Sequence, residues 1–199
     1  MATGVWATQA LEAVVLAAGS GARFGGGKLT AAYGPGVLLD GALAAAFAAP
    51  VRGVTVVTGA DAERVAAAAR GFDPRTRIVH AADHAEGMGA SLRAGIASLP
   101  ADAQGAFVFL GDMPRVPHPV LGLLADAVEA GAPAAAPTFG GRRGNPVVLG
   151  RALFPQLLAL KGDAGARELL AELSDLALVP APDDGVLFDV DVPGDLPPP

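Results

Sequence analysis

A short apolar run that stops at a glycine-rich loop places the strongest constraint on this chain. Residues 13–16 are Ala-Val-Val-Leu, and the stretch from Leu16 to Lys28 then holds five glycines, one arginine and one lysine. The apolar run predicts a buried strand. Glycines let backbone N–H groups approach an oxyanion closely, and successive N–H groups in such turns form an anion-binding concavity. The stretch therefore predicts a strand followed by a phosphate-binding loop, in which Arg23 and Lys28 supply positive charge.

The spacing within this loop separates three kinds of nucleotide-binding loop. A Walker A loop needs glycine at the position of Ala22 and a hydroxyl at the position of Leu29, so it fails twice. A dinucleotide-binding fingerprint, G-x-G-x-x-G, starts with Gly19 and Gly21, but Phe24 stands in place of the third glycine. The pattern that remains, G-x-G-x-R-x-G-x-x-K, puts two cations into the loop itself. Two fixed cations suit a triphosphate whose charge moves during a reaction.

Beyond the loop, strand-type and helix-type segments alternate along the chain. We expect strands at 53–58, 75–80 and 105–110 and helices at 37–49, 61–70, 88–99 and 117–130. Alternating strands and helices, with strands apolar on both faces, predict a parallel sheet covered by helices. The fold class expected from this order is α/β, Rossmann-like and doubly wound.

The pattern changes after residue 131, where two strands follow each other across a short turn. We expect strands at 132–138, 145–149, 177–179 and 186–190 and helices at 152–160 and 164–173. A hairpin added to a parallel core predicts a mixed, mostly parallel sheet. We expect one domain over residues 11–196, preceded by a loose lead-in at residues 1–10.

Composition excludes several kinds of function. The chain has 199 residues, the size of one ordinary domain, and a formal net charge of −6, which opposes non-specific binding to nucleic acid or to an anionic membrane. It has no cysteine, so disulfides, thiolate metal sites and a cysteine nucleophile are excluded. The first ten residues carry no Lys or Arg, and no apolar run reaches the roughly 18 residues that span a bilayer. We therefore expect a cytoplasmic protein.

Carboxylates follow two of the expected strands. Asp112 comes directly after the apolar strand that ends at residue 110, and ligands of open α/β sheets bind outside the carboxyl ends of the strands. A carboxylate there suits Mg²⁺, and the alternative is the N-cap of the next helix. Near the end of the chain, Asp189 and Asp191 alternate with apolar residues, so on a strand they point to one face. They predict either a second part of a metal site or the solvated side of an edge strand, and we expect Asp195 to be a structural charge at a helix N-terminus.

The loop resembles the signature of the MobA-like NTP transferases, close to LAAGxSxRxGxxK, and in particular that of their molybdenum cofactor cytidylyltransferase branch. Gly21 stands where that branch carries serine. The GDMP at 111–114 is similar to the family's metal-binding GDxP, and DVDVPGDL at 189–196 is similar to DxDTPxDL, with Val192 in place of threonine. The segment GMGASLRAG at 87–95 resembles GMSSSLRAG, in which Gly and Ala replace two serines.

The resemblance implies a GT-A-like nucleotide-diphospho-sugar transferase fold and assigns roles to particular residues. The catalytic cations are Arg23 and Lys28. The residues implied to bind the nucleotide, together with these two, are Leu16, Ala17, Ala18, Gly19, Gly21, Gly87, Ser91 and Asp112. The implied ligands of Mg²⁺ are Asp112, Asp191 and Asp189. For Ser91 the alternative is an ordinary helix cap.

Two further segments are implied to face the acceptor. RGNP at 143–146 is similar to the family's RGxP, and GDAGAR at 162–167 to its GDxGAR. The acceptor-binding residues would then be Arg143, Asn145, Asp163 and Arg167. The alternative for the two arginines is that they are solvated loop charges.

The resemblance implies an Mg²⁺-dependent transfer of CMP from CTP to molybdenum-molybdopterin, a phosphorylated pterin, with release of pyrophosphate and with a recipient molybdoenzyme as a further partner. His80, His84 and His118 lie in no motif, and we expect them at the surface or in packing roles. Three alternatives stay open. In the first, the nucleotide donor is GTP instead of CTP. In the second, the acceptor is another phosphorylated compound, such as a sugar phosphate. In the third, the protein is a nucleotide- or cofactor-binding chaperone that catalyses no reaction.

Overall fold

The central strands of the sheet are those that the apolar runs predict. A computed structural model describes residues 10–160 and 166–196. The parallel strands are β1 (Leu11–Ala17), β4 (Val54–Thr58), β5 (Arg77–His80) and β6 (Gly105–Leu110). β1 pairs in parallel with β4 on one side and β6 on the other, and β4 pairs with β5. β1, β4 and β6 are buried along almost their whole length, as expected of strands covered on both faces.

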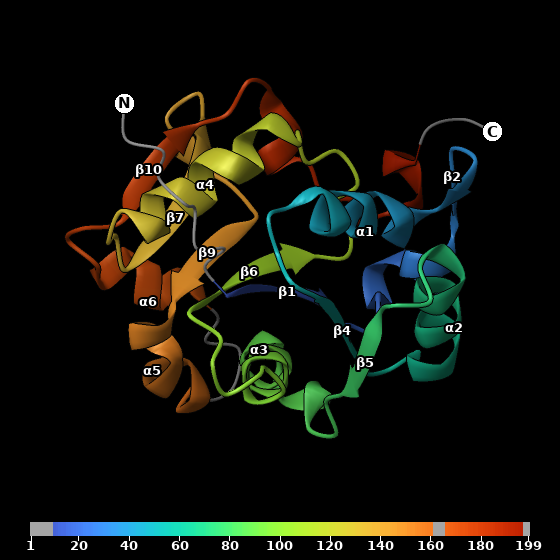
Figure 1. Ribbon diagram of the computed structural model, residues 1–199. Coiled ribbons are helices and arrows are strands. Elements are labelled where there is room, and N and C mark those ends of the chain that lie inside the picture. The colour runs from blue at the N-terminus through green and yellow to red at the C-terminus, as the bar shows by residue number, and fades with distance from the viewer. Residues whose placement is uncertain (1–9, 161–165, 197–199) are drawn as a thin grey trace.

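Helices cover both faces of this sheet (Figure 1). On one face the apolar core joins the sheet to α1 (Leu38–Ala48), α2 (Ala62–Phe72) and α4 (Pro119–Glu129). On the other face a second cluster joins it to α3 (Met88–Ala97), α5 (Phe154–Leu158) and α6 (Ala166–Glu172). No helix in the described part of the chain is long and apolar enough to cross a membrane.

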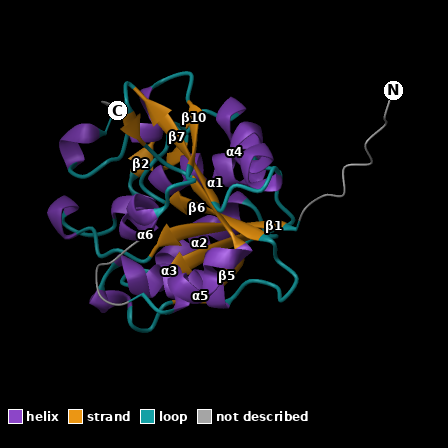
Figure 2. Ribbon diagram, turned by 90° about the vertical axis from the view of Figure 1, so that its left-hand side faces the viewer, coloured by secondary structure: helices purple, strands orange, loops and turns teal. Residues whose placement is uncertain are grey.

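The second half of the chain adds antiparallel pairs to the sheet, as the hairpin pattern predicts. Its strands are β7 (Ala134–Phe139), β8 (Arg142–Arg143), β9 (Val147–Gly150) and β10 (Ala177–Pro180); β8 pairs antiparallel with β7, whereas β10 pairs in parallel with it. β9 lies antiparallel between β6 and β7, and the order across the sheet is β10-β7-β9-β6-β1-β4-β5. Figure 2 shows the resulting twist. The predicted α/β fold with a mixed, mostly parallel sheet is confirmed.

Short 3-10 helices lie in the loops between these elements. They are η1 (Ala22–Phe24), η2 (Lys28–Thr30), η3 (His84–Glu86), η4 (Arg151–Leu153), η5 (Asp184–Leu187) and η6 (Pro193–Asp195). A small hairpin, β2 (Ala32–Tyr33) with β3 (Gly36–Val37), follows the glycine loop and is absent from the sequence expectations. The expected lead-in at residues 1–10 lies outside the described residues except for its last one.

The strand expected at 186–190 is wrong. A carboxylate oxygen of Asp183 accepts the N–H of Gly185 at 2.8 Å and starts η5, so the chain turns where the sequence pattern predicts an extended strand. Gly185 also packs directly against the backbone carbonyl of Arg115, where no side chain fits. In the segment that follows, the N–H of Val190 donates to the carbonyl of Asp112, just beyond the end of β6 (3.1 Å).

Candidate active site

Several glycines of the loop after β1 have a left-handed backbone conformation. Its glycines with positive φ are Gly21 (59°), Gly25 (92°), Gly26 (93°) and Gly27 (64°). Because only glycine adopts this region at little cost, the sequence there is dictated by the backbone path. Within the described residues, the backbone N–H groups of residues 19–23 donate to no carbonyl and to no side chain. Five consecutive N–H groups are therefore left free for an anion, as an anion-binding loop requires.

The loop meets the carboxylate of Asp112 because two strand ends are joined. The N–H of Gly111 donates to the carbonyl of Leu16 at 2.9 Å, which holds the end of β6 beside the end of β1. The Lys28 ammonium then donates to the Asp112 carboxylate at 2.7 Å and to the carbonyl of Val190 at 2.9 Å. α4 begins seven residues after Asp112 with His118 at its N-cap, so the helix-cap alternative for Asp112 is excluded.

The C-terminal carboxylates lie at the same place without forming a strand. Asp191 accepts from the Arg23 guanidinium at 3.1 Å, and its other oxygen lies 3.9 Å from the Lys28 ammonium. Partial burial, together with the charges of Asp112 and Asp191, raises the pKa of Asp189 above its ordinary value. Residues far apart in the chain are thus brought together, with the carboxylates of Asp112 and Asp191 against one ammonium and Asp189 near enough to be influenced by their charges.

Asp195 has the structural role expected of it. Its carboxylate accepts the N–H groups of Asp191 at 2.8 Å and Val192 at 2.9 Å, and these two bonds lower the pKa of Asp195. They fix the turn that presents Asp191 to the loop cations.

The chemistry of the carboxylates fits a hard divalent cation. In the described part of the chain, no group of three His, Cys, Asp or Glu side chains is already arranged around a common metal position. Mg²⁺ and similar ions need only one or two protein carboxylates when phosphates and water complete the shell. Asp112 and Asp191 meet this requirement, because both lie against one positive charge, the Lys28 ammonium, and so are close enough to share a cation.

The other predicted nucleotide-binding segment lies at the start of α3. Gly87 is its N-cap, with φ 122° and ψ −172°, a conformation reserved for glycine. Ser91 is the fourth residue of the helix, so it is not the cap. It is 6% exposed. A histidine without a motif also lies at this edge, since a Cβ at Gly59 would be 2.7 Å from the His84 ring.

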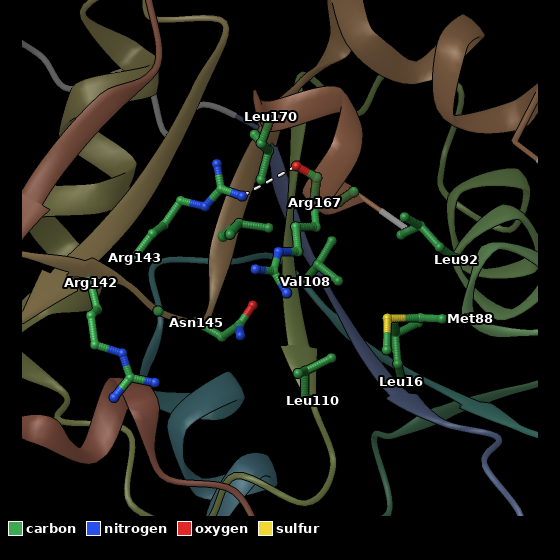
Figure 3. Close-up of a pocket in the computed structure, with 13 residues that line it drawn as sticks. Leu16, Met88, Leu92, Val108, Leu110, Arg142, Arg143, Asn145, Arg167 and Leu170 are labelled. Carbon is green, nitrogen blue, oxygen red and sulfur yellow. Dashed lines mark hydrogen bonds between the residues drawn. The ribbon is translucent and has the colours of Figure 1, made fainter. Parts of the chain in front are cut away.

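A cavity of about 690 Å³ lies beside the strand ends (Figure 3). Leu16 and Leu110, which directly precede the glycine loop and the Gly-Asp turn, are part of its wall, so the cavity adjoins both. Its other apolar lining residues are Met88, Leu92, Val108, Val147, Ala166 and Leu170. This volume is typical of small-molecule sites.

Polar residues at the rim of this cavity include three of the four predicted acceptor-binding residues. Arg143, Asn145 and Arg167 line it, and Arg143 donates to the carbonyl of Arg167 at 3.2 Å. Figure 3 shows Arg167 and Asn145 pointing toward each other across the middle, while Arg142 lies apart at the edge. Asp163 lies outside the described residues.

Arg64 and Asp61, at the start of α2, lie against the glycine loop and belong to none of the family motifs in the sequence. The Asp61 carboxylate accepts the N–H of Gly27 at 3.1 Å, and a Cβ at Gly27 would be 3.5 Å from a terminal nitrogen of Arg64. The sequence pattern indicates only that Asp61 lies at an expected helix start, and it gives no sign of the contact with the loop.

The comparison with known families decides what kind of protein presents these residues. Residues 13–176 match the family described as the MobA-like NTP transferase domain. The chain belongs to this family. The resemblance drawn from the glycine loop is thereby confirmed at the level of the family, and this MobA-like chain is a nucleotidyltransferase domain.

Solved structures agree with this assignment. The MobA-like chain is similar to Rv0371c from Mycobacterium tuberculosis H37Rv, with TM-score 0.82 and 28% identity, over 94% of this chain and 96% of that one. A complex of Rv0371c with manganese matches with TM-score 0.74 and 26% identity, over 86% and 88% of the two chains. A nucleotidyl transferase from Methanothermobacter, Mth528, matches with TM-score 0.78 and 26% identity, over 94% of each chain.

A curated relative covers less of the chain. The purine catabolism protein PucB of Bacillus subtilis is 32% identical over 127 residues, which is 61% of this chain. The match spans 60% of the length of PucB.

Proposed function

We propose that this MobA-like protein transfers a nucleotide from a nucleoside triphosphate to a phosphorylated acceptor, and that the pair is CTP and molybdenum-molybdopterin. The observation that carries the proposal is the meeting of Lys28 with Asp112 and Asp191 beside a cavity rimmed by arginines. It puts phosphate-binding cations, candidate metal ligands and room for an acceptor at one edge of the sheet. We further propose that residues 11–196 act as one catalytic domain.

The chain's own groups divide the work of binding. The unused N–H groups of residues 19–23 cradle the triphosphate, and Ser91 offers a hydroxyl at the start of α3. Arg143 and Arg167 attract the phosphate of the acceptor, whose apolar body fits the leucine- and valine-lined wall. Asn145 lies between them as a neutral donor and acceptor.

The reaction itself is an attack by an acceptor phosphate oxygen on the α-phosphorus, with pyrophosphate leaving. A divalent cation held by Asp112 and Asp191, with Asp189 beside them, would neutralise charge on the α-phosphate when bound. Arg23 and Lys28 stabilise the leaving pyrophosphate once their carboxylates no longer hold them. We propose Mg²⁺ as this cation; that Rv0371c was solved in a complex with manganese supports the use of a divalent ion.

The proposal is tested by incubating the purified protein with Mg²⁺ or Mn²⁺, each of the four common nucleoside triphosphates and, in separate assays, molybdenum-molybdopterin or a sugar phosphate as the acceptor, and measuring pyrophosphate. We expect release with CTP and little with the others. Preference for GTP would assign the chain to guanylyl transfer, and release only with a sugar phosphate would replace the acceptor. No pyrophosphate under any condition would overturn transfer altogether.

The chaperone alternative needs a separate readout. Asp112→Ala should abolish both metal binding and the maturation of the recipient molybdoenzyme in cells, because the carboxylate is needed for turnover. If cellular function survives this substitution while metal binding is lost, the protein acts as a carrier.

A further inference from the structure

The first turn of α2 clamps the glycine loop. The Asp61 carboxylate takes up the N–H of Gly27, and the Thr30 hydroxyl donates to the Gly27 carbonyl at 3.2 Å, so both backbone groups of this residue are fixed. The Arg64 guanidinium lies directly over Gly27, 3.5 Å from where a Cβ would be. A third cation is thus held beside the two that the loop itself supplies.

Unlike Arg23 and Lys28, Arg64 forms no ion pair with a carboxylate of the described residues. Arg23 is paired with Asp191 and Lys28 with Asp112. Arg64 is exposed, and no carboxylate of the described residues lies within 4.0 Å of its guanidinium. An anion can therefore bind Arg64 without breaking an ion pair.

The position of α2 tells which part of a nucleotide Arg64 meets. The cavity that would hold the acceptor is lined by β6, β8, β9, α3 and α6, whereas α2 packs against β4 and α1. Figure 1 shows α2 and α6 at opposite sides of the molecule, with β1 and β6 between them. In an in-line displacement the attacking and leaving oxygens lie on opposite sides of the phosphorus. An acceptor that attacks from the cavity side therefore expels pyrophosphate toward α2.

We propose that Arg64 is a further substrate-binding residue, which binds the β- and γ-phosphates of the nucleoside triphosphate and the pyrophosphate that leaves. The inference rests on the proposed function, since it takes the triphosphate to lie along the glycine loop. The Arg64 guanidinium can form two parallel hydrogen bonds to phosphate oxygens, a geometry that the ammonium of Lys28 lacks.

Calorimetry with Mg²⁺ and three probes, CTP, CMP and pyrophosphate, tests this without any acceptor. Arg64→Gln should weaken CTP and pyrophosphate by about 10- to 100-fold, the worth of a charge-assisted hydrogen bond, and leave CMP unchanged. Arg64→Lys should fall between, because it keeps the charge and loses the paired geometry. Arg70→Gln is the matched control, since Arg70 is an exposed arginine on the last turn of the same helix.

The outcomes separate this inference from the function on which it rests. Wild type that binds CTP and pyrophosphate, with Arg64→Gln equal to it, overturns the role of Arg64 and leaves the proposed function intact. Equal losses of CMP and CTP in Arg64→Gln also overturn it, because they indicate a general effect on the loop. Wild type that binds neither CTP nor pyrophosphate overturns both. Melting temperatures of all variants show whether each is folded.

Discussion

Lys28 is the residue on which the two halves of the site converge. Its ammonium contacts Asp112, just after β6, and the carbonyl of Val190 from the C-terminal segment, and its side chain is only 13% exposed. In a partly buried place, an ammonium that joins two carboxylates is worth more than a surface ion pair. Asp112 and Asp191 are held close to each other because this charge lies between them.

Lys28→Met should therefore abolish most of the nucleotidyl transfer. We expect kcat to fall by about 10²- to 10³-fold, as when one preorganised donor to a developing oxyanion is removed. The measurement is pyrophosphate release at saturating nucleotide. Arg75→Gln, which breaks an exposed ion pair with Asp73 at the end of α2, serves as the control and should leave kcat unchanged. Wild-type kcat in Lys28→Met would remove Lys28 from the catalytic residues.

Sequence patterns identify a residue when a motif or a strand end surrounds it. Asp112 follows a buried strand whose observed bounds, 105–110, are the predicted ones, and Lys28 closes a glycine loop of fixed spacing. Arg64 has no such context, because its position depends on how α2 packs against η2. That contact joins residues almost forty positions apart in the chain and has no local pattern.

Among the elements, α3 shows how closely the helices approach the sheet. A Cβ at Gly95 would lie 2.5 Å from a methyl group of Val14 and 3.1 Å from one of Val57, so the helix rests on β1 and β4 through a bare backbone. Gly122 of α4 lies on an open side, with no atom within 4 Å of the same position. The two glycines are therefore expected to respond oppositely to the same substitution.

Gly95→Ala should destabilise the protein by about 1–3 kcal/mol, because overpacking against Val14 and Val57 exceeds the gain in helix propensity. Gly122→Ala should stabilise it by about 0.5–1 kcal/mol through propensity alone. Urea unfolding followed by far-UV circular dichroism measures both. A stable Gly95→Ala variant would mean that α3 moves away from the sheet without cost.

Arg93 ties α3 to two neighbouring segments. It forms an ion pair with Asp83 before η3 and donates to the carbonyl of Leu160 after α5. The Arg93 guanidinium lowers the pKa of the Asp83 carboxyl below its ordinary value. A lowered folded-state pKa means that Asp83 contributes stability above its unfolded pKa, and that this contribution is lost as pH falls through the folded value.

Asp83→Asn should accordingly melt at a lower temperature than wild type at pH 7, and the difference should close as pH falls below about 4, the ordinary pKa of aspartate. Asp83 is only half-buried and solvent screens its ion pair, so the effect is small. Differential scanning calorimetry between pH 7 and pH 3 measures it. Asp126→Asn, an exposed position on α4, should show no pH-dependent difference; a gap for Asp83→Asn that persists at pH 3 would contradict the ion-pair explanation.

The elements that the sequence does not predict are those decided by contacts made elsewhere in the chain. The alternation of Phe188 to Val192 is typical of a strand, but the turn fixed by Asp183 and the close approach of Gly185 to Arg115 prevent one. The hairpin of β2 and β3 is only two residues long on each side, too short for a periodic pattern. By contrast, β1, β4 and β6 follow from their apolar runs because both faces are buried.

Across the whole molecule, the candidate active site and a buried ion-pair cluster lie at opposite ends of the sheet. At the amino ends of the parallel strands, Glu12 is 2% exposed and is held by Arg52 at 2.9 Å and by Arg77. Arg52 in turn pairs with Asp102 at 2.8 Å. This cluster joins the starts of β1 and β5 and the loop before β6, and it lies a strand length away from Asp112.

Glu12→Gln should lower the free energy of unfolding by about 1–3 kcal/mol, because charge-assisted hydrogen bonds to both arginines are lost. Replacing Arg52 and Arg77 together by leucine should cost more, since it leaves a buried carboxylate without a counter-charge. Urea unfolding gives both values. Nucleotide affinity at 25 °C should stay unchanged in Glu12→Gln, and a change in it would show that the two ends of the sheet are coupled.

The reversed direction of β9 has a consequence for how such proteins diversify. Because β9 starts at the edge where β6 ends, Arg142, Arg143 and Asn145 of the cavity rim come from one uninterrupted stretch, residues 142–147, while Arg167 comes from α6. The triphosphate loop and the acids come from other parts of the chain. Under the proposed function, a lineage that exchanges this hairpin would change most of the polar contacts to the acceptor and would keep the residues proposed to activate the nucleotide.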